Sequence, residues 1–322
     1  MPRIVSLIAS ATEIVAALGQ LRNLVGRSHE CDFPPEVKAL PICTKPRIDV
    51  SADSREIDAQ IRRSVAQALS IYDVFDEILD QLQPTHIITQ AQCEVCAVSL
   101  RDVEKSVASR LRSQPRIVSL QPNSLADIWE DFRRVAQSLD VDAEPVIDDL
   151  RSRMQRITEK ALASSNRPRV ACIEWMEPLM AAGNWTPELV EMAGGVNLFG
   201  ESGKHSPWMT WRELVESRPD ITIAMPCGFD LARTRKEIHW LTRNSAFAGL
   251  SGKLYLADGN QFFNRPGPRV AESLEILAEI THPEIFEAKT IGIGWETMEG
   301  ELTADGAAGL KTELPAESMQ DG

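Results

Sequence analysis

Residues 145–164, PVIDDLRSRMQRITEKALAS, form the longest uninterrupted helical pattern of this sequence and lie near its middle. Their apolar residues recur at steps of three or four, which predicts an amphipathic helix with one buried stripe. The stripe consists of Val146, Leu150, Met154, Ile157 and Ala161. A helix of about 20 residues spans about 30 Å, the width of a small domain. We therefore predict that this helix joins two lobes, with a long core helix of one domain as the alternative.

On both sides of this helix, short β-rich apolar runs alternate with helical patterns. The runs that predict strands are residues 3–8, 24–27, 86–89 and 116–120 before the helix, and 169–173, 221–225 and 253–257 after it. Such alternation is typical of parallel βαβ units. The predicted fold class is therefore α/β, with two doubly wound parallel-sheet lobes joined by one long helix.

The domain boundaries follow from this alternation. We predict an N-terminal α/β lobe at residues 1–122, connecting helices at 123–166 and a C-terminal α/β lobe at 167–287. Residues 288–322 lack periodicity and are acidic and rich in glycine, which predicts a disordered tail. Within the first lobe, residues 54–82 are predicted as one long helix.

Composition limits the classes of partner. The net charge of -13 and the lack of a Lys/Arg cluster argue against nucleic acid. No apolar run approaches the roughly 20 residues that cross a membrane. The first residues, MPRIVSLIAS, begin a strand and lack the pattern of a secretory signal. We therefore expect a cytoplasmic monomer, or a periplasmic protein if the start codon is mis-called.

Several segments resemble a known family. They are RIVSLIASATEIVAALG, GRSHECDFPPEV, THIITQAQC, GNWTPELVEMAGGVNLFG, WRELVESRPDITIAMPCG and PGPRVAESLEILAEITHPE. Together with the central helix, they resemble the helical-backbone (class III) substrate-binding proteins of ABC importers, over about residues 3–285. The resemblance implies a non-catalytic protein that binds cobalamin, haem, siderophores or metal ions, and among characterised branches the sequence looks closest to the cobalamin-binding proteins.

A ligand site is predicted between the lobes, because ligands of open α/β sheets bind beyond the carboxyl ends of the strands. A cobalamin-like corrinoid, or another tetrapyrrole or siderophore, needs large rigid apolar surfaces such as indoles. For the tryptophans, core packing is the alternative interpretation. The predicted ligand-binding residues are Thr12, Glu13, His29, Cys31, Gln92, Cys93, Trp175, Trp185, Trp208 and Phe229.

The cysteines support an alternative hypothesis. Cys93 and Cys96 form a CxxC pair, whose spacing binds zinc or iron when two further ligands are supplied. His29 and Cys31 are candidates for those ligands. On this hypothesis the chain is a cytoplasmic metal-binding or redox protein, and otherwise the cysteines are small packed residues.

The resemblance also implies partners, namely a small-molecule ligand and the membrane subunits of an ABC importer. In the family, one acidic surface residue on each lobe docks arginines of those subunits. Glu213 matches the second-lobe residue, and Glu94 is a looser candidate in the first lobe. Enzyme motifs do not fit: residues 200–204, GESGK, have the wrong neighbours for a nucleophile elbow or a phosphate loop. We therefore predict no catalytic residues.

Overall fold

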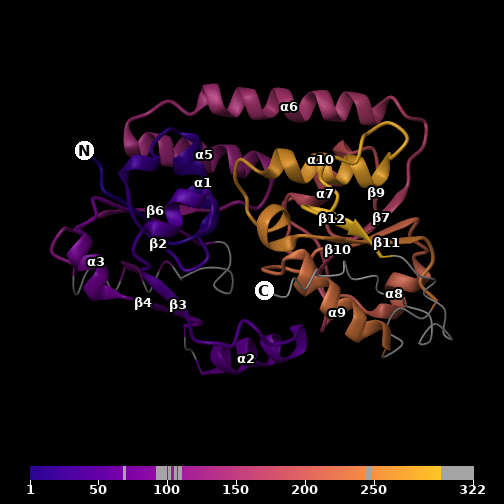
Figure 1. Cartoon of the computed structure of the whole chain (residues 1–322), viewed down its shortest axis with the longest axis horizontal. Helices are drawn as coiled ribbons and strands as arrows, with labels where there is room; N and C mark the ends of the chain where they lie inside the picture. Colours follow the sequence, from indigo (N-terminus) through magenta and orange to yellow (C-terminus); the bar gives the residue numbers. More distant parts are fainter. Residues whose placement is uncertain are drawn as a thin grey trace, which may run out of the picture.

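The long helix α6 (Glu144–Leu162) runs along one side of the molecule, and both lobes lie on the same side of it (Figure 1). The computed structural model describes residues 1–67, 70–91, 100, 103–104, 107, 111–243 and 249–298. The helix confirms the amphipathic pattern, with Ile147 as an additional buried residue and Val146 only partly buried. Arg153 of α6 donates hydrogen bonds to Glu272 at 3.0 Å and to Glu275 at 2.6 Å, both in the last helix of the second lobe.

The first lobe contains a parallel sheet in the order β2-β1-β5-β6. Its strands are β1 (Ile4–Ser6), β2 (Leu24–Arg27), β5 (His86–Gln90) and β6 (Arg116–Leu120). Helix α1 (Ala9–Ala17) follows β1. Helix α5 (Leu125–Leu139) follows β6 and begins with a capping box, in which Ser124 and Asp127 exchange hydrogen bonds.

The predicted helix at residues 54–82 is wrong in its second half. The chain instead forms α2 (Ser54–Ala66), β4 (Tyr72–Val74) and α3 (Asp76–Leu82). Strand β4 pairs antiparallel with β3 (Thr44–Pro46), and the preceding Ile71 is buried. The β-rich run IYDVF also fits a helical period, but burial and the tertiary ladder decide its conformation.

The second lobe contains a six-stranded mixed sheet with parallel central strands. The order is β12-β11-β10-β7-β8, and β9 pairs with β7. The strands are β7 (Arg169–Trp175), β8 (Met180–Ala181), β9 (Val196–Asn197), β10 (Ile221–Ala224), β11 (Lys253–Ala257) and β12 (Trp295–Thr297). The helices are α7 (Thr186–Met192), α8 (Trp211–Glu216), α9 (Leu231–Arg243) and α10 (Val270–Thr281).

Residues 288–298 do not belong to the disordered tail that was expected from residue 288 onward. Strand β12 pairs antiparallel with β11 and completes an edge of the second sheet. Trp295 is buried, and its indole Nε1 donates to Glu279 of α10 at 2.7 Å. The ring of Trp295 also packs on that of Tyr255. A strand of only three residues has too little periodicity to be recognised in the sequence. Residues 299–322 lie outside the described chain.

One hydrophobic cluster extends through both lobes. It includes Ile14 of α1, Phe132 of α5, Met154 of α6 and Leu274 of α10. Because such interiors are close-packed, movement of one lobe against the other would separate buried side chains. The shared core therefore favours a fixed arrangement of the lobes. In the described part of the chain, no helix has the length and apolar character needed to span a membrane.

Candidate ligand site between the lobes

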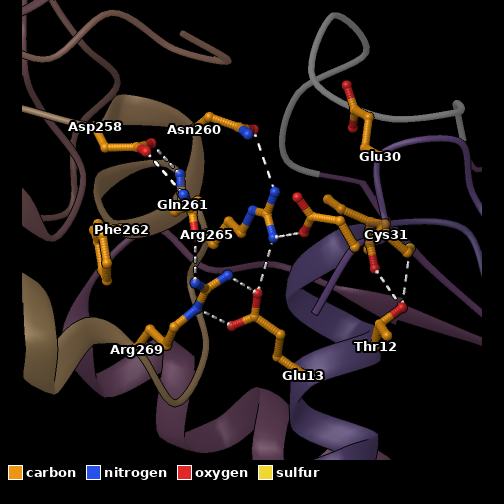
Figure 2. A network of polar contacts seen from close by, with 12 residues as sticks. Thr12, Glu13, Glu30, Cys31, Asp258, Asn260, Gln261, Phe262, Arg265 and Arg269 are labelled. Atoms are coloured by element: carbon orange, nitrogen blue, oxygen red, sulfur yellow. Dashed lines mark hydrogen bonds and ion pairs between the residues drawn. The ribbon is translucent and has the colours of Figure 1, made fainter. Parts of the chain in front are cut away.

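Charged side chains from the two lobes form a network of ion pairs (Figure 2). Arg265 and Arg269 lie between the short helix η3 (Gly259–Phe263) and α10, and both point toward Glu13 of α1. Arg269 Nε donates to Glu13 Oε2 at 2.9 Å, and Arg265 Nη1 donates to Glu13 Oε1 at 3.1 Å. Arg265 Nη1 also donates to Asp32, beyond β2, at 2.5 Å. We call these four residues the interlobe network.

The interlobe network pairs two cations with two anions, and all but Asp32 are nearly inaccessible to water. Glu13, Arg265 and Arg269 are 1%, 4% and 7% exposed, respectively. Burial disfavours the charge of Asp32, but hydrogen bonding and attraction to Arg265 outweigh it and hold the pKa of Asp32 below its usual value. Glu13 was predicted at the ligand site, and the structure places its carboxylate in this contact between the lobes.

An aromatic pair lies beside the interlobe network in the second lobe. Trp175, the last residue of β7, is half-buried, and its ring packs edge-on against buried Phe229 at a centroid distance of 5.5 Å. The carbonyl of Phe229 accepts from the backbone N–H of Asn260 at 3.0 Å. The Asn260 side chain in turn accepts from Arg265 at 3.3 Å. The predicted residues Trp175 and Phe229 therefore lie together at the carboxyl end of β7.

The loop after β2 carries His29 and Glu30. His29 Nδ1 lies 2.9 Å from the Thr44 hydroxyl, and its ring lies 5.5 Å from that of Tyr72. Burial and the charge of Arg27 lower the pKa of His29 to about 4, so its imidazole is neutral near pH 7. Nε2 has no hydrogen-bond partner in the described part of the chain. It lies 3.9 Å from a carboxylate oxygen of Glu30.

Glu30 lies in the loop after β2 that was predicted to reach the gap, although it was not among the predicted ligand-binding residues. Its side chain is 41% exposed, yet surrounding protein removes enough water to raise the pKa of its carboxyl to about 7, against the opposing charge of Arg265. Its position next to His29 in the predicted loop was a usable signal. No signal in the sequence indicated the approach of Arg265, because that contact depends on the packing of segments that are distant in the sequence.

Thr12 and Cys31 lie inside the first lobe, although they were predicted at the site. The Thr12 hydroxyl donates to Ser6 at 2.8 Å and to the Cys31 sulfur at 3.0 Å, and both Thr12 and Cys31 are fully buried. Burial raises the pKa of the Cys31 thiol. A thiol that remains protonated is a poor nucleophile and a poor metal ligand.

The other predicted tryptophans occupy different surroundings. Trp185 is 5% exposed and belongs to the shared core beside α7. Trp208 is 57% exposed, with the guanidinium of Arg62 5.9 Å from its ring centre. Trp185 and Trp208 were selected because the sequence places them in loops. That position does not determine the direction in which each side chain points.

Four predicted residues, Gln92, Cys93, Glu94 and Cys96, lie outside the described residues. Among those that are described, no group of three or more His, Cys, Asp or Glu side chains is placed to hold a metal ion. Glu213 is exposed and begins α8 in a capping box, where its carboxylate accepts from the Thr210 backbone at 2.7 Å and from the Thr210 hydroxyl at 2.8 Å.

Comparison with known proteins gives a family and a fold. Residues 4–251 match the sequence profile of a family described as periplasmic binding protein. A periplasmic heme binding protein from Pseudomonas aeruginosa is 19% identical, with 93% of this chain and 99% of that one aligned at a TM-score of 0.68. The vitamin B12 binding protein BtuF of Vibrio cholerae is 19% identical, with coverage of 88% and 97% and a TM-score of 0.59.

A third solved structure, a periplasmic heme-binding protein from Roseiflexus sp. RS-1, is 20% identical, with coverage of 87% and 96% and a TM-score of 0.61. No curated protein sequence matches this chain significantly. The expected cytoplasmic location is wrong, because the family and these three structures are all described as periplasmic. That expectation depended on the first few residues, whereas the family match extends over residues 4–251.

Proposed function

Because this chain belongs to the periplasmic binding protein family, we propose that it binds a tetrapyrrole between its lobes, with a cobalamin-like corrinoid as the first candidate, and that it catalyses no reaction. The main support is the aromatic pair of Trp175 and Phe229 at the carboxyl end of β7. We propose that Trp175 provides the apolar surface against which the flat macrocycle packs.

The geometry of this pair suits such a ligand. Phe229 is 1% exposed and holds the indole of Trp175 at an interplanar angle of 69°, while Trp175 itself stays partly accessible. A tryptophan that is already oriented loses little conformational freedom on binding. Aromatic side chains bury about 150 to 250 Å² each, which is a large apolar contact for one residue.

His29 and Glu30 support a ligand with a central metal. The imidazole of His29 is neutral near pH 7, because burial and Arg27 lower its pKa to about 4. Nε2 is not hydrogen-bonded within the described residues. A neutral imidazole nitrogen is a common ligand of tetrapyrrole iron. We propose that His29 contacts the metal-bearing centre of the ligand and that Glu30 contacts its polar edge.

The family assignment supports a role in uptake. We propose that the protein acts outside the cytoplasmic membrane and delivers its ligand to the membrane subunits of an ABC importer. Glu213 is exposed and remains the proposed docking residue of the second lobe, with Glu94 as its first-lobe counterpart. Replacing Glu213 with Gln keeps the size of the side chain and tests whether its charge contributes to that docking.

Titration of the purified protein with cyanocobalamin and with haemin tests ligand binding. We expect a change in the absorption spectrum and a calorimetric heat at micromolar concentrations with at least one of the two. Trp175→Ala should weaken binding by roughly tenfold or more, because it removes the apolar surface on which the macrocycle packs. Trp211→Ala is the matched control, because Trp211 packs within the second lobe on α8. Neither a spectral change nor heat with both ligands would reject the proposal.

A further inference from the structure

A second set of contacts joins the lobes on the side of the molecule away from α6. Residues 44–67 and 70–74 leave the first lobe as an arm, with β3 and β4 paired at its base and α2 at its tip (Figure 1). Helix α2 extends below the gap between the lobes as Figure 1 is drawn and reaches α9 of the second lobe.

The arm is attached to α9 by a few polar groups. The Ser54 backbone N–H donates to Glu237 at 3.2 Å, and its hydroxyl donates to the same carboxylate oxygen. Arg233 donates to the carbonyl of Ala52 at 2.7 Å. Ser54 is fully buried and Glu237 is 6% exposed. We call these four residues the α2–α9 contact.

The α2–α9 contact connects to the proposed ligand site. The guanidinium carbon of Arg233 lies 3.6 Å from the ring centre of Phe229, and Phe229 packs on Trp175. Through Asn260, Phe229 also adjoins the interlobe network. In the first lobe, His29 contacts Thr44 and Tyr72 at the base of the arm. These contacts therefore form a ring around the gap, with Trp175 and Phe229 between the two connections of the lobes.

The two connections differ in how easily they separate. The interlobe network holds four charges, three of which are nearly inaccessible to water, and the lobes also share a core. Helix α2 buries only Ser54 and Ile57, so its release from α9 exposes little apolar surface. The base of the arm packs into the first-lobe core through Ile71 and Tyr72, and Ile61 of α2 packs against the same cluster. Separation of α2 from α9, with the base of the arm left in place, is therefore the easier movement.

We propose that this arm is a lid, which releases α2 from α9 to admit and discharge the ligand while the two lobes keep their positions. The proposal rests on the proposed function, since it assigns a route to the ligand site beside Trp175. Arg233 couples the lid to that site, because the same side chain holds Ala52 of the arm and covers the ring of Phe229.

Stopped-flow kinetics with cyanocobalamin and haemin tests the lid. The lid variant is Ser54→Ala with Glu237→Gln, and Ser54→Ala alone serves if that pair does not fold. The matched control is Ser164→Ala with Glu216→Gln. The Ser164 hydroxyl accepts locally from the backbone N–H of Asn166 at 3.1 Å, and Glu216 pairs with Arg212 on the exposed face of α8. Neither residue belongs to the interlobe network or to the arm.

The lid variant should raise both the association and the dissociation rate constants by about tenfold, the factor that corresponds to one hydrogen bond to a charged group. The Kd should change by less than roughly threefold, because the lid affects the two rates in the same direction. The control should match the wild type. If ligand binds and the lid variant keeps wild-type rate constants, the lid proposal is overturned.

Amide hydrogen exchange of the ligand-free protein separates this failure from a failure of the proposed function. Even if no tetrapyrrole binds, α2 amides should exchange faster in the lid variant than in the wild type, while those of α6 and β7 remain unchanged. That result would support the interpretation that the arm is a lid and that the site it covers binds a different ligand. Exchange of α2 at the same rate as β7 in both proteins would show that the arm opens only with global unfolding and would overturn the lid.

Discussion

Two connections hold the lobes together, and they are built differently. The interlobe network places Glu13 between two arginines, and each of these three residues is at most 7% exposed. The α2–α9 contact relies on one carboxylate, one hydroxyl and one guanidinium, and most of α2 remains outside the core. A buried charge that loses its partner is costly, whereas an arm that separates returns its polar groups to water. We therefore expect the interlobe network to stay fixed and the α2–α9 contact to be the one that opens.

Removing the charge of Glu13 should produce the largest effect. Glu13→Gln keeps the size of the side chain but leaves Arg265 and Arg269 with Asp32 as their remaining anionic partner in the network. We expect the free energy of unfolding to fall by about 3 to 5 kcal/mol, the range for breaking a buried ion pair. Urea denaturation followed by circular dichroism measures this change.

Glu130→Gln is the control for this experiment. Glu130 pairs with Arg133 at 2.6 Å, but its side chain is 60% exposed. An exposed pair contributes about 0.2 to 1 kcal/mol. Equal losses in Glu130→Gln and Glu13→Gln would show that burial of the interlobe network does not make it the stronger connection.

Weakening the other connection should affect the molecule locally. Glu237→Gln removes the charge that accepts both hydrogen bonds from Ser54. We expect exchange of α2 amides to accelerate, while the global free energy of unfolding falls by no more than about 1 kcal/mol. Hydrogen exchange and urea denaturation of the same variant measure the two quantities. A global loss as large as that of Glu13→Gln would mean that the arm unfolds together with the lobes.

The parts of the fold that follow local patterns could be predicted from the sequence. The stripe from Leu150 to Ala161 determines α6, and apolar runs locate the central strands of both sheets. The break between α2 and β4 could not be predicted, because residues 70–75 suit either structure until β3 is present. Strand β12 is similarly too short to show a period.

The candidate site was less predictable for a related reason. Strand ends in the sequence identify the positions of Trp175, at the end of β7, and of His29, in the loop after β2. Side-chain direction is set by packing, so Thr12 and Trp185 were selected although they are buried within the protein. The interlobe network was missed because Arg269 and Glu13 are 256 positions apart and no sequence period relates them.

Glu30 lies near Arg265 of the interlobe network and near His29 at the base of the arm, and it should make stability depend on pH. The surrounding protein partly desolvates its carboxyl and raises the pKa to about 7 from the ordinary value of 4.5. The folded protein therefore holds this proton more tightly than the unfolded chain, and stability falls as the pH rises from about 4.5 to about 7. Since the side chain is 41% exposed, solvent screening limits the loss to about 1 kcal/mol. Denaturation across this range measures it.

The neighbouring histidine acts in the opposite direction. Burial lowers the pKa of His29 to about 4, so its contribution is present above about pH 6.5 and is lost as the pH falls. The difference between the wild type and Glu30→Gln therefore isolates the carboxyl. If both proteins show the same pH profile, Glu30 does not occupy the desolvated position between the interlobe network and the base of the arm.

The smallest effect should come from the edge of the α2–α9 contact. Arg55 lies 4.9 Å from the ring centre of Trp240 and 3.9 Å from a carboxylate oxygen of Glu177, but its side chain is 61% exposed. Exposed contacts of both kinds are weak, so Arg55→Ala should change the free energy of unfolding by about 0.5 kcal/mol or less. Exchange of α2 amides should accelerate less than in Ser54→Ala. If Arg55→Ala opens α2 as readily as Ser54→Ala does, exposed cation–π and ionic contacts hold the lid, and the buried hydrogen bonds to Glu237 do not.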